Sequence, residues 1–413
     1  MKILMIDKYF FIKGGAERYY FELSNILKAK NHEVIPFSMK HEDNFPSSYS
    51  EFFVENIEYN LSGTWKKVKN SFRIMGRMIY SFHAKNRLEK LIGRIKPDIA
   101  HLHMIDHQLS PSILHTLKKY SIPVIQTVHQ YKLVCPNYRL YNMYKQQICE
   151  KCINGNYFHP IFERCHKDSM AAGLMVGLEM YIHKLMKIYE KNIDLFHVPS
   201  YFMGEKIGQV GIPGERIKHL FYTIEIDNYP PNYNPEDYFI YYGRLAKEKG
   251  ILTLLKAMNY LKNSKLIIVG DGPQRVELEN FVEKNNLFQV KFLGIKNGDE
   301  LNKIVSKSQF VIVPSEWYDN SPLVIYESFS MGKPVIGATI GGIPELIDHE
   351  KNGLHFQPGN VDELVERINF LLNKPQLIKE FGMNARKKAE FEFAPEPHYK
   401  KILGLYQTLI KRK

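Results

Sequence analysis

The stretch of sequence that decides the fold runs from Phe310 to Ile347 and reads FVIVPSEWYDNSPLVIYESFSMGKPVIGATIGGIPELI. Its apolar beginning, Phe310–Val313, predicts a buried parallel strand. Ser321 and Pro322 predict the start of a helix, with serine as the N-cap and proline at the first helical position. A second apolar strand is predicted over Pro334–Ile336. This order of elements indicates an α/β domain built on a parallel sheet.

Acidic side chains lie at both turns of this stretch. Asp319 precedes the first predicted helix, Glu327 lies inside it, and Glu345 follows the glycine pair at 341–342. Ligands of α/β proteins bind at the carboxyl edge of the sheet, where helix N-termini favour anions. Ionised carboxylates only accept hydrogen bonds, so they suit the hydroxyl groups of a ribose or another sugar. The combination predicts a site for a sugar nucleotide.

The same stretch resembles the donor-binding segment of retaining glycosyltransferases of family 4. In that family two acids stand eight positions apart and are followed by GKPV and GGxPE, which match Asp319, Glu327, 332–335 and 341–345 here. The family usually has glutamate at the first acidic position, so Glu316 is an alternative contact to the donor sugar. The resemblance implies catalytic roles for Asp319 and Glu327. It also implies donor contacts from the residues between the two acids, namely Asn320, Ser321, Pro322 and Leu323.

A second motif, GRLAKEKG, follows the predicted strand 238–242. Arg244 offers a planar fork and Lys249 a mobile point charge, which together suit a diphosphate. In family 4 the same segment binds the nucleotide diphosphate, so we expect both cations to hold the donor. The glycines of the two strand-ending turns in this half are further donor-site candidates, Gly243 and Gly270.

The amino-terminal half begins with a predicted strand over residues 2–7, followed by FFIKGGAE. Glycines let the backbone approach a ligand closely, and the segment resembles the family's amino-terminal glycine loop. We therefore assign Gly15 to the donor side and Gly14 to the acceptor side. A long helix is expected over 170–190, and a strand over 195–199 is expected to close the first sheet.

Several histidines lie near predicted strand ends in this half of the chain. His129 follows a TxH strand, where the family places a histidine near the donor sugar, so the resemblance implies a catalytic role. His103 and His107 are candidates for the acceptor side. His101 is interpreted as a hydrogen-bonded structural histidine.

The length of 413 residues predicts two domains. We expect an acceptor-side domain over 1–222, with a cysteine-rich insert at 130–168, and a donor-binding domain over 223–396. The resemblance implies two Rossmann-like domains facing across a cleft, the GT-B architecture. It also implies that the last helix, 397–413, crosses back to the first domain.

All four cysteines fall within 31 residues, as one CxxC pair with a single cysteine on either side. This spacing suits a tetrahedral thiolate set, and the segment is too poor in aliphatic residues to order itself. We predict a structural zinc ion, with free or regulatory thiols as the alternative, because disulfides are not expected in a cytoplasm. The predicted ligands are Cys135, Cys149, Cys152 and Cys165.

The net charge of +12 is densest at residues 64–96, which hold ten basic residues and one acid. The interleaved apolar residues make this stretch amphipathic. It can lie on an anionic membrane surface, or pack on the core with a solvated basic face. No nucleic-acid-binding motif accompanies the charge, so nucleic acid is not an expected partner. MKILMIDKY reads as the start of a strand, so we expect a cytoplasmic protein, peripheral on the inner face of the plasma membrane if the basic stretch binds lipid.

Together these features predict a retaining transferase that moves a hexosyl unit from a nucleotide-diphosphate sugar to a saccharide acceptor. A lipid-linked acceptor in surface polysaccharide synthesis is the expected pathway. The motifs include no Asp-x-Asp, so no catalytic metal is expected, and Arg244 and Lys249 would stabilise the departing diphosphate. Two alternatives stay open. One is a nucleotide-sugar epimerase of the same architecture, and the other is a non-enzymatic, basic nucleic-acid-binding protein with a zinc knuckle.

Overall fold

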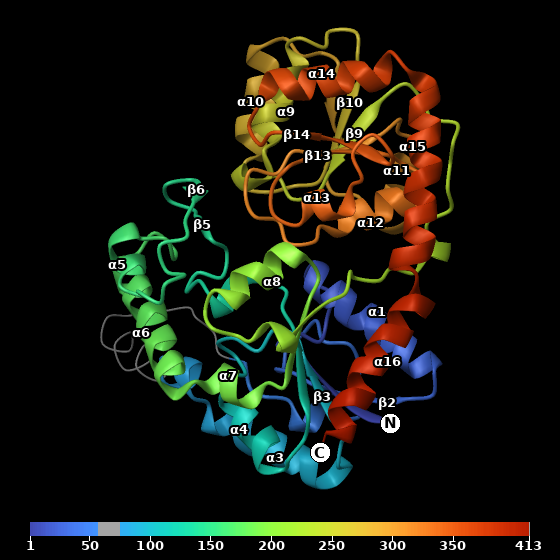
Figure 1. Cartoon of the computed structure of the whole chain (residues 1–413). Helices are drawn as coiled ribbons and strands as arrows, with labels where there is room; N and C mark the ends of the chain where they lie inside the picture. Colours follow the sequence, from blue (N-terminus) through green and yellow to red (C-terminus); the bar gives the residue numbers. More distant parts are fainter. Residues whose placement is uncertain (57–74, 413) are drawn as a thin grey trace. The chain divides into compact units, whose positions relative to one another are not determined.

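The computed structural model describes residues 1–56 and 75–412, and the chain divides into two compact units (Figure 1). Unit 1 comprises Met1–Leu220 and His398–Lys413, and unit 2 comprises Phe221–Pro397. Each unit is built on a six-stranded sheet in which every neighbouring pair of strands is parallel. The prediction of two Rossmann-like α/β sheets is confirmed.

The sheet of unit 1 has the strand order β2-β1-β3-β4-β7-β8. Four of these strands are apolar and almost fully buried, as their sequences predict. The strands are β1 (Lys2–Ile6), β2 (Glu33–Phe37), β3 (Ile99–Leu102), β4 (Val124–Thr127), β7 (Leu195–Val198) and β8 (Ile217–His219). The helices are α1 (Gly15–Ala29), α3 (Phe82–Ile95), α4 (Ser112–Lys119), α5 (His159–Glu163), α6 (Met170–Met186), α7 (Ile188–Asn192) and α8 (Tyr201–Gly208).

Two predictions for unit 1 were wrong. The strand at 195–199 does not close the sheet, because β8 pairs with β7 beyond it. Strand β8 is short and only partly buried, with a lysine at its centre, so it makes no apolar run in the sequence. The helix predicted over 170–190 is two helices, since Lys187 between α6 and α7 adopts the left-handed conformation at φ 47°.

The basic stretch at 64–96 is described only from residue 75 onward, and 64–74 lie outside the described residues. Its helix α3 begins after Ser81, whose hydroxyl accepts from the amide of Ala84 at 3.1 Å. Arg94 on the outer side pairs with Glu51 at 2.6 Å. The described helix therefore packs on the core with a solvated basic face, and its buried residues are Ala84, Leu88, Leu91, Ile92 and Ile95.

The sheet of unit 2 has the order β11-β10-β9-β12-β13-β14. Its strands are β9 (Phe239–Tyr242), β10 (Leu266–Val269), β11 (Val290–Phe292), β12 (Val311–Val313), β13 (Val335–Ala338) and β14 (Gly353–Phe356). Its helices are α9 (Ile251–Met258), α10 (Arg275–Lys284), α11 (Gly298–Ser306), α12 (Leu323–Ser330), α13 (Ile343–Leu346), α14 (Val361–Leu372) and α15 (Pro375–Lys388). The strand order reverses between β9 and β12, which is the position where such sheets bind ligands.

Helix α12 starts one residue later than the sequence predicts, at Leu323. Its N-cap is Pro322, and no side chain caps it. The hydroxyl of Ser321 lies 2.6 Å from that of Tyr326 instead. The predicted N-cap role of Ser321 was therefore wrong, because a tertiary hydrogen bond takes up the side chain.

Helix α16 (Pro395–Lys411) returns to unit 1, as the family resemblance implies. Tyr406 contributes its hydroxyl to a 2.6 Å hydrogen bond with Nδ1 of His101, and His398 bonds Tyr19 at 2.9 Å. Ile402 and Leu409 of the same helix are buried. Among residues 1–56 and 75–412, no helix is both long and apolar enough to span a membrane.

Candidate functional site

The loops after β9 and β12 meet at the reversal of strand order in unit 2. Nζ of Lys249 lies 2.6 Å from Oδ2 of Asp319, and the Ser315 hydroxyl donates to the same oxygen at 2.9 Å. The ammonium group also stands 5.4 Å from the ring centre of Trp317. Both charged side chains are partly exposed, at 22% and 11%. The structure thus joins a cation and an acid that the sequence assigned to the donor separately.

The neighbouring charges are held differently. Arg244 is half-exposed and pairs with the buried Glu248. Glu316, the alternative to Asp319, accepts a hydrogen bond from Thr253 of α9 at 2.5 Å. Of Asp319 and Glu316, only Asp319 forms an ion pair with Lys249, the residue predicted to bind the diphosphate. The position of Asp319 therefore fits the predicted donor site better than that of Glu316.

Glu327 lies in the second turn of α12 and is almost fully buried. Burial, followed by the Glu327 charge, holds the pKa of Tyr242 well above its usual value. The Tyr242 hydroxyl donates to the carbonyl of Val324 at 2.7 Å and lies 3.0 Å from the hydroxyl of Ser328. Tyr242 at the end of β9 is therefore hydrogen-bonded to residues of α12 on both sides of Glu327 in the sequence.

Two glycines allow these loops to approach closely. A Cβ on Gly341, which has φ 60°, would stand 2.2 Å from the carbonyl oxygen of Asp319. A Cβ on Gly270, at φ 133°, would stand 1.9 Å from the carbonyl of Gly243. Gly270 of the predicted donor site, and Gly341 in the neighbouring turn, are thus required by the backbone itself.

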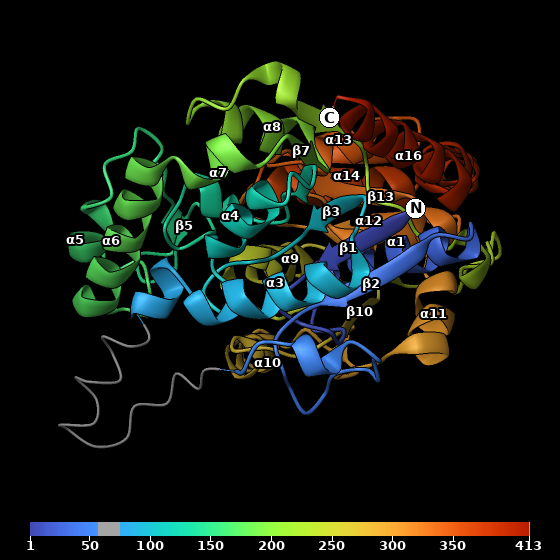
Figure 2. The same cartoon turned by 90° about the horizontal axis from the view of Figure 1, so that it is seen from below.

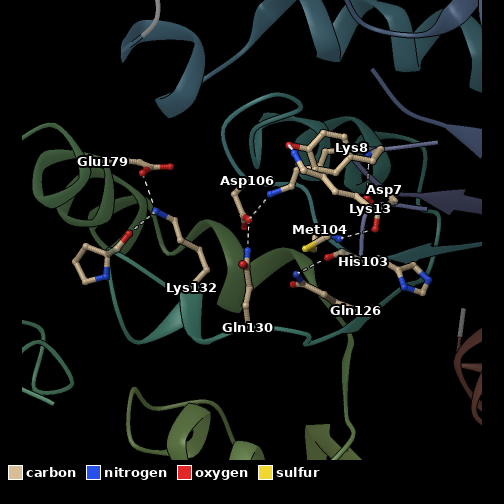
Figure 3. A network of polar contacts seen from close by, with 12 residues as sticks. Asp7, Lys8, Lys13, His103, Met104, Asp106, Gln126, Gln130, Lys132 and Glu179 are labelled. Atoms are coloured by element: carbon tan, nitrogen blue, oxygen red, sulfur yellow. Dashed lines mark hydrogen bonds and ion pairs between the residues drawn. The ribbon is translucent and has the colours of Figure 1, made fainter. Parts of the chain in front are cut away.

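A second polar network lies at the corresponding edge of unit 1, after β1 and β3 (Figure 3). Lys8 donates its amide to the carbonyl of Met104 at 2.8 Å, and its Nζ lies 3.5 Å from Oδ2 of Asp106. Gln130 donates to the same carboxylate. Asp7 is buried, which raises the pKa of its carboxyl well above the usual value. Lys8, Asp106 and Gln130 were not among the predicted site residues, although each lies within four residues of the end of β1, β3 or β4.

The predicted histidines of unit 1 are brought together in part. Nδ1 of His103 lies 2.9 Å from Nε2 of His129, and their rings stack at 5.1 Å. Burial lowers the pKa of His129 to about 3 and that of His103 well below its usual value, so both are neutral at pH 7. His101 bonds Thr127 at 2.7 Å. No hydrogen bond described for the resolved part of the chain joins His107 to this cluster, so it stands apart.

The glycine loop leads directly into helix α1. Gly14 is the N-cap of α1 with extended backbone, and a Cβ there would meet nothing closer than 3.6 Å. Gly15 is the first residue of the helix. The approach of a ligand to these two glycines stays a prediction.

The segment after β4 contains a buried ion pair that the sequence analysis also missed. Nζ of Lys132 lies 2.7 Å from Oε2 of Glu179 on α6, and the two side chains are 4% and 1% exposed. Burial raises the pKa of Glu179, while Lys132 opposes that shift. The pair fastens the cysteine-rich segment to α6.

The four cysteines are free, and three of them are buried. Oδ1 of Asn137 accepts hydrogen bonds from the Cys135 thiol at 2.9 Å and from the amide of Arg139 at 3.0 Å. Burial raises the pKa of the Cys135 thiol. Burial, followed by the charges of Cys135 and Cys149, raises the pKa of Cys165 to about 12. Within residues 1–56 and 75–412, however, no group of three or more His, Cys, Asp or Glu side chains is arranged to hold a metal ion. The geometry does not assemble the predicted zinc site.

Comparison with known proteins identifies the family. Residues 13–221 match the profile described as Glycosyltransferase Family 4, and residues 224–388 match Glycosyl transferases group 1. The chain therefore belongs to glycosyltransferase family 4, a family of retaining sugar transferases with the GT-B fold.

Its curated relatives include the uncharacterized glycosyltransferase MJ1178 of Methanocaldococcus jannaschii, 35% identical over 180 residues, 43% of this chain and 50% of that protein. The sulfoquinovosyl transferase SQD2 of Arabidopsis thaliana is 25% identical over 326 residues, 74% of this chain and 55% of that one. The chain thus spans about half the length of these two relatives. The sucrose-phosphate synthase of Thermosynechococcus elongatus has the same fold, with a TM-score of 0.72, 20% identity and 100% of both chains covered.

Proposed function

We propose that this protein transfers a hexosyl unit, with retention of configuration, from a nucleotide-diphosphate sugar to a saccharide acceptor. The observation that carries the proposal is the Lys249–Asp319 pair at the reversal of strand order in unit 2. A cation for the diphosphate and an acceptor for sugar hydroxyls stand side by side there. An epimerase would leave the family membership unexplained, and a nucleic-acid-binding protein would leave both the family membership and this pairing unexplained.

In the proposed reaction the donor binds the domain of residues 223–396 and the acceptor binds that of residues 1–222. The anomeric carbon–oxygen bond of the donor breaks, and the acceptor hydroxyl attacks the same face of the sugar. Its proton passes to the departing phosphate oxygen. Arg244 and Lys249 neutralise the leaving diphosphate, while Asp319 and Glu327 accept from sugar hydroxyls. His129, half-buried and neutral, retains the catalytic role implied by the resemblance.

The names of similar proteins support the choice of substrates. A solved structure of Anabaena HepE in complex with UDP-glucose has a TM-score of 0.65 and 17% identity to this chain, with 99% and 100% of the two chains covered. The O-antigen chain mannosyltransferase C of Escherichia coli is 26% identical over 182 residues. We therefore propose a uridine-containing donor and a lipid-linked saccharide acceptor in surface polysaccharide synthesis.

Calorimetric titration with UDP-, GDP- and ADP-sugars tests the proposal. We expect one of them to bind, and Lys249→Ala to weaken that binding at least tenfold, because the ammonium group is only partly exposed. Lys265→Ala is the matched control, since Lys265 is 66% exposed beside Asp237 in the same unit. Absence of binding by every sugar nucleotide, or equal loss in both variants, would refute the proposed donor site.

We also propose that the four cysteines hold a structural zinc ion. Their spacing and the burial of three of the thiols support this proposal. The sulfurs would have to draw together around the ion. Elemental analysis of purified protein should find one zinc per chain, lost in Cys152→Ser. A metal-free wild-type protein that is folded would favour free thiols instead.

A further inference from the structure

Helix α6 carries an exposed apolar face. Four of its side chains are exposed to solvent by 39% to 85%, and their spacing in sequence places them within an arc of about 80° on one side of the helix. They are Met170, Leu174, Leu178 and Leu185. Helix α5 packs beside α6 (Figure 2) and adds Phe158, its N-cap residue, at 58% and Phe162 at 74%. We call these six residues the α5–α6 face.

The opposite side of α6 is buried, and beside Val176 and Met180 it contains two glycines and two polar side chains. Cβ atoms on Gly173 and Gly177 would lie 2.2 Å and 2.4 Å from the carbonyl oxygens of Pro160 and Tyr157, so the backbones meet closely there. Glu179 and His183 also point inward, where Glu179 pairs with Lys132. A helix in a water-soluble surface normally turns the other way, with its carboxylate and imidazole outside and its leucines inside. The close glycine contacts and the Glu179–Lys132 ion pair fix α6 in the orientation that leaves its leucines exposed.

The exposed charges around this face are mostly basic. Within α6, all of whose residues are described, Glu179 is the single acid and it is buried. Asp168, an exposed acid near its start, pairs with Arg164 at 3.0 Å. Exposed basic residues flank the helix at both ends, namely Arg164, Lys167, Lys184, Lys187 and Lys191.

We propose that the α5–α6 face docks on an anionic lipid bilayer, lying in the plane of the headgroups. Leucine and phenylalanine side chains on one side of a helix, with lysines at its ends, are the combination that binds such an interface. A contiguous apolar surface of this kind is uncommon on a monomer unless it contacts something. The positive rim distinguishes an anionic membrane from a neutral apolar partner. This proposal stands apart from the proposed transferase activity, because lipid binding requires neither donor nor acceptor.

Flotation of the full chain with vesicles tests the proposal. Vesicles of phosphatidylcholine with about a third phosphatidylglycerol should carry the protein upward, and pure phosphatidylcholine vesicles should carry much less. Leu174→Glu with Leu185→Glu should lower the bound fraction at least tenfold, because both side chains would enter the apolar boundary. Phe288→Glu is the matched control, since Phe288 is 91% exposed in unit 2. Lys184→Gln with Lys187→Gln should lower binding to the anionic vesicles alone.

The outcomes separate this inference from its competitors and from the proposed function. Equal flotation of the Leu174→Glu/Leu185→Glu protein and the wild type, or no flotation of either, would overturn the membrane proposal. A wild-type dimer that the double variant converts to monomer, with no vesicle binding, would show that the face meets a second copy. Calorimetry with the sugar nucleotide should give the same affinity for the double variant and the wild type, so failure of either proposal is visible without the other.

Discussion

Both units place polar residues at the carboxyl edge of their sheets, but the burial of these residues and the charge they carry differ between the units. In unit 2 the reversal of strand order carries partly exposed charges, with Lys249 and Asp319 paired at 2.6 Å. The equivalent edge of unit 1 also has an ion pair, between Lys8 and Asp106, but its buried acid Asp7 has a raised pKa, and His103 and His129 are held neutral. Fourteen of the sixteen histidines lie in unit 1, because only His349 and His355 fall within Phe221–Pro397. The shared topology thus determines at which edge of the sheet a ligand can bind. The burial of the side chains at that edge determines whether they are charged.

The largest effect should come from breaking the buried ion pair of unit 1. Lys132→Met leaves the carboxyl of Glu179 buried without its ion-pair partner, so we expect a loss of about 3–5 kcal/mol in unfolding free energy. Lys40→Met is the control, because Lys40 and Glu55 lie 2.6 Å apart but are 45% and 54% exposed, and it should cost less than about 1 kcal/mol. Hydrogen exchange of unit 1 peptides measures both. Adding Glu179→Leu to Lys132→Met should recover most of the loss, and equal losses in the two single variants would contradict the comparison.

A backbone test in unit 2 should have the next largest effect. Gly341→Ala drives a Cβ toward the carbonyl of Asp319, so we expect a loss of about 2–3 kcal/mol and weaker binding of the sugar nucleotide. Gly359→Ala shares the positive φ, at 76°, but has open space around it, so it should cost about 1 kcal/mol. Chemical denaturation followed by the fluorescence of Trp317 reports on this unit. If Gly341→Ala and Gly359→Ala lose the same unfolding free energy, crowding by the carbonyl of Asp319 is not the reason why position 341 requires glycine.

Acidification should destabilise unit 1 through its buried histidines. Burial lowers the pKa of His197 to about 4, against about 6.5 in the unfolded chain. Between these values the unfolded chain binds more protons, so stability is complete above about pH 6.5 and falls as the pH drops toward 4. The raised pKa values of Asp7 and Glu179 act in the opposite direction. The measurement is therefore the difference between the wild type and His197→Gln.

From pH 7 to pH 5, hydrogen exchange should show unit 1 of the wild type losing roughly 1–2 kcal/mol more than unit 1 of His197→Gln. Peptides of unit 2 should change equally in the two proteins and serve as the internal control. An identical pH dependence of unit 1 in both proteins would mean that His197 does not resist protonation in the folded state.

The smallest effect compares two serines that precede helices. Ser200 caps α8 by accepting from the amide of Met203 at 3.1 Å, whereas Ser321 bonds Tyr326 and caps nothing. Ser200→Ala should cost about 1 kcal/mol and speed exchange of the first amides of α8. Ser321→Ala should cost no more than that and leave the first amides of α12 unchanged. Faster exchange of the first amides of α12 in Ser321→Ala would show that Ser321 caps the helix, as the sequence predicts.

Most strands and the donor segment could be predicted because their signals are local. Buried parallel strands read as apolar runs, and the spacing of Asp319 from Glu327 is a motif within one stretch. Strand β8 was not predicted because its stability comes from pairing with β7, whereas its own three residues form no apolar run. The start of α12 was misplaced because Tyr326, which is in the helix, takes up the Ser321 side chain.

The polar groups of unit 1 could not be predicted because they depend on distant partners. Lys132 and Glu179 are 47 positions apart, and Lys8 and Asp106 come from different strand ends. In the sequence each of these residues looks like an ordinary surface charge. The predicted histidines His103 and His129 were placed near strand ends correctly, but only the folded sheet shows that their rings meet.

The return of helix α16 has a consequence for the order in which the protein is completed during synthesis. His398 and Tyr406 supply hydrogen bonds to Tyr19 and His101 inside unit 1, yet they are translated after every residue of unit 2. Unit 2 is a single continuous segment, so it can finish folding while the half that was made first still lacks part of its core. Most of unit 1 is translated before unit 2, yet unit 1 is completed after it.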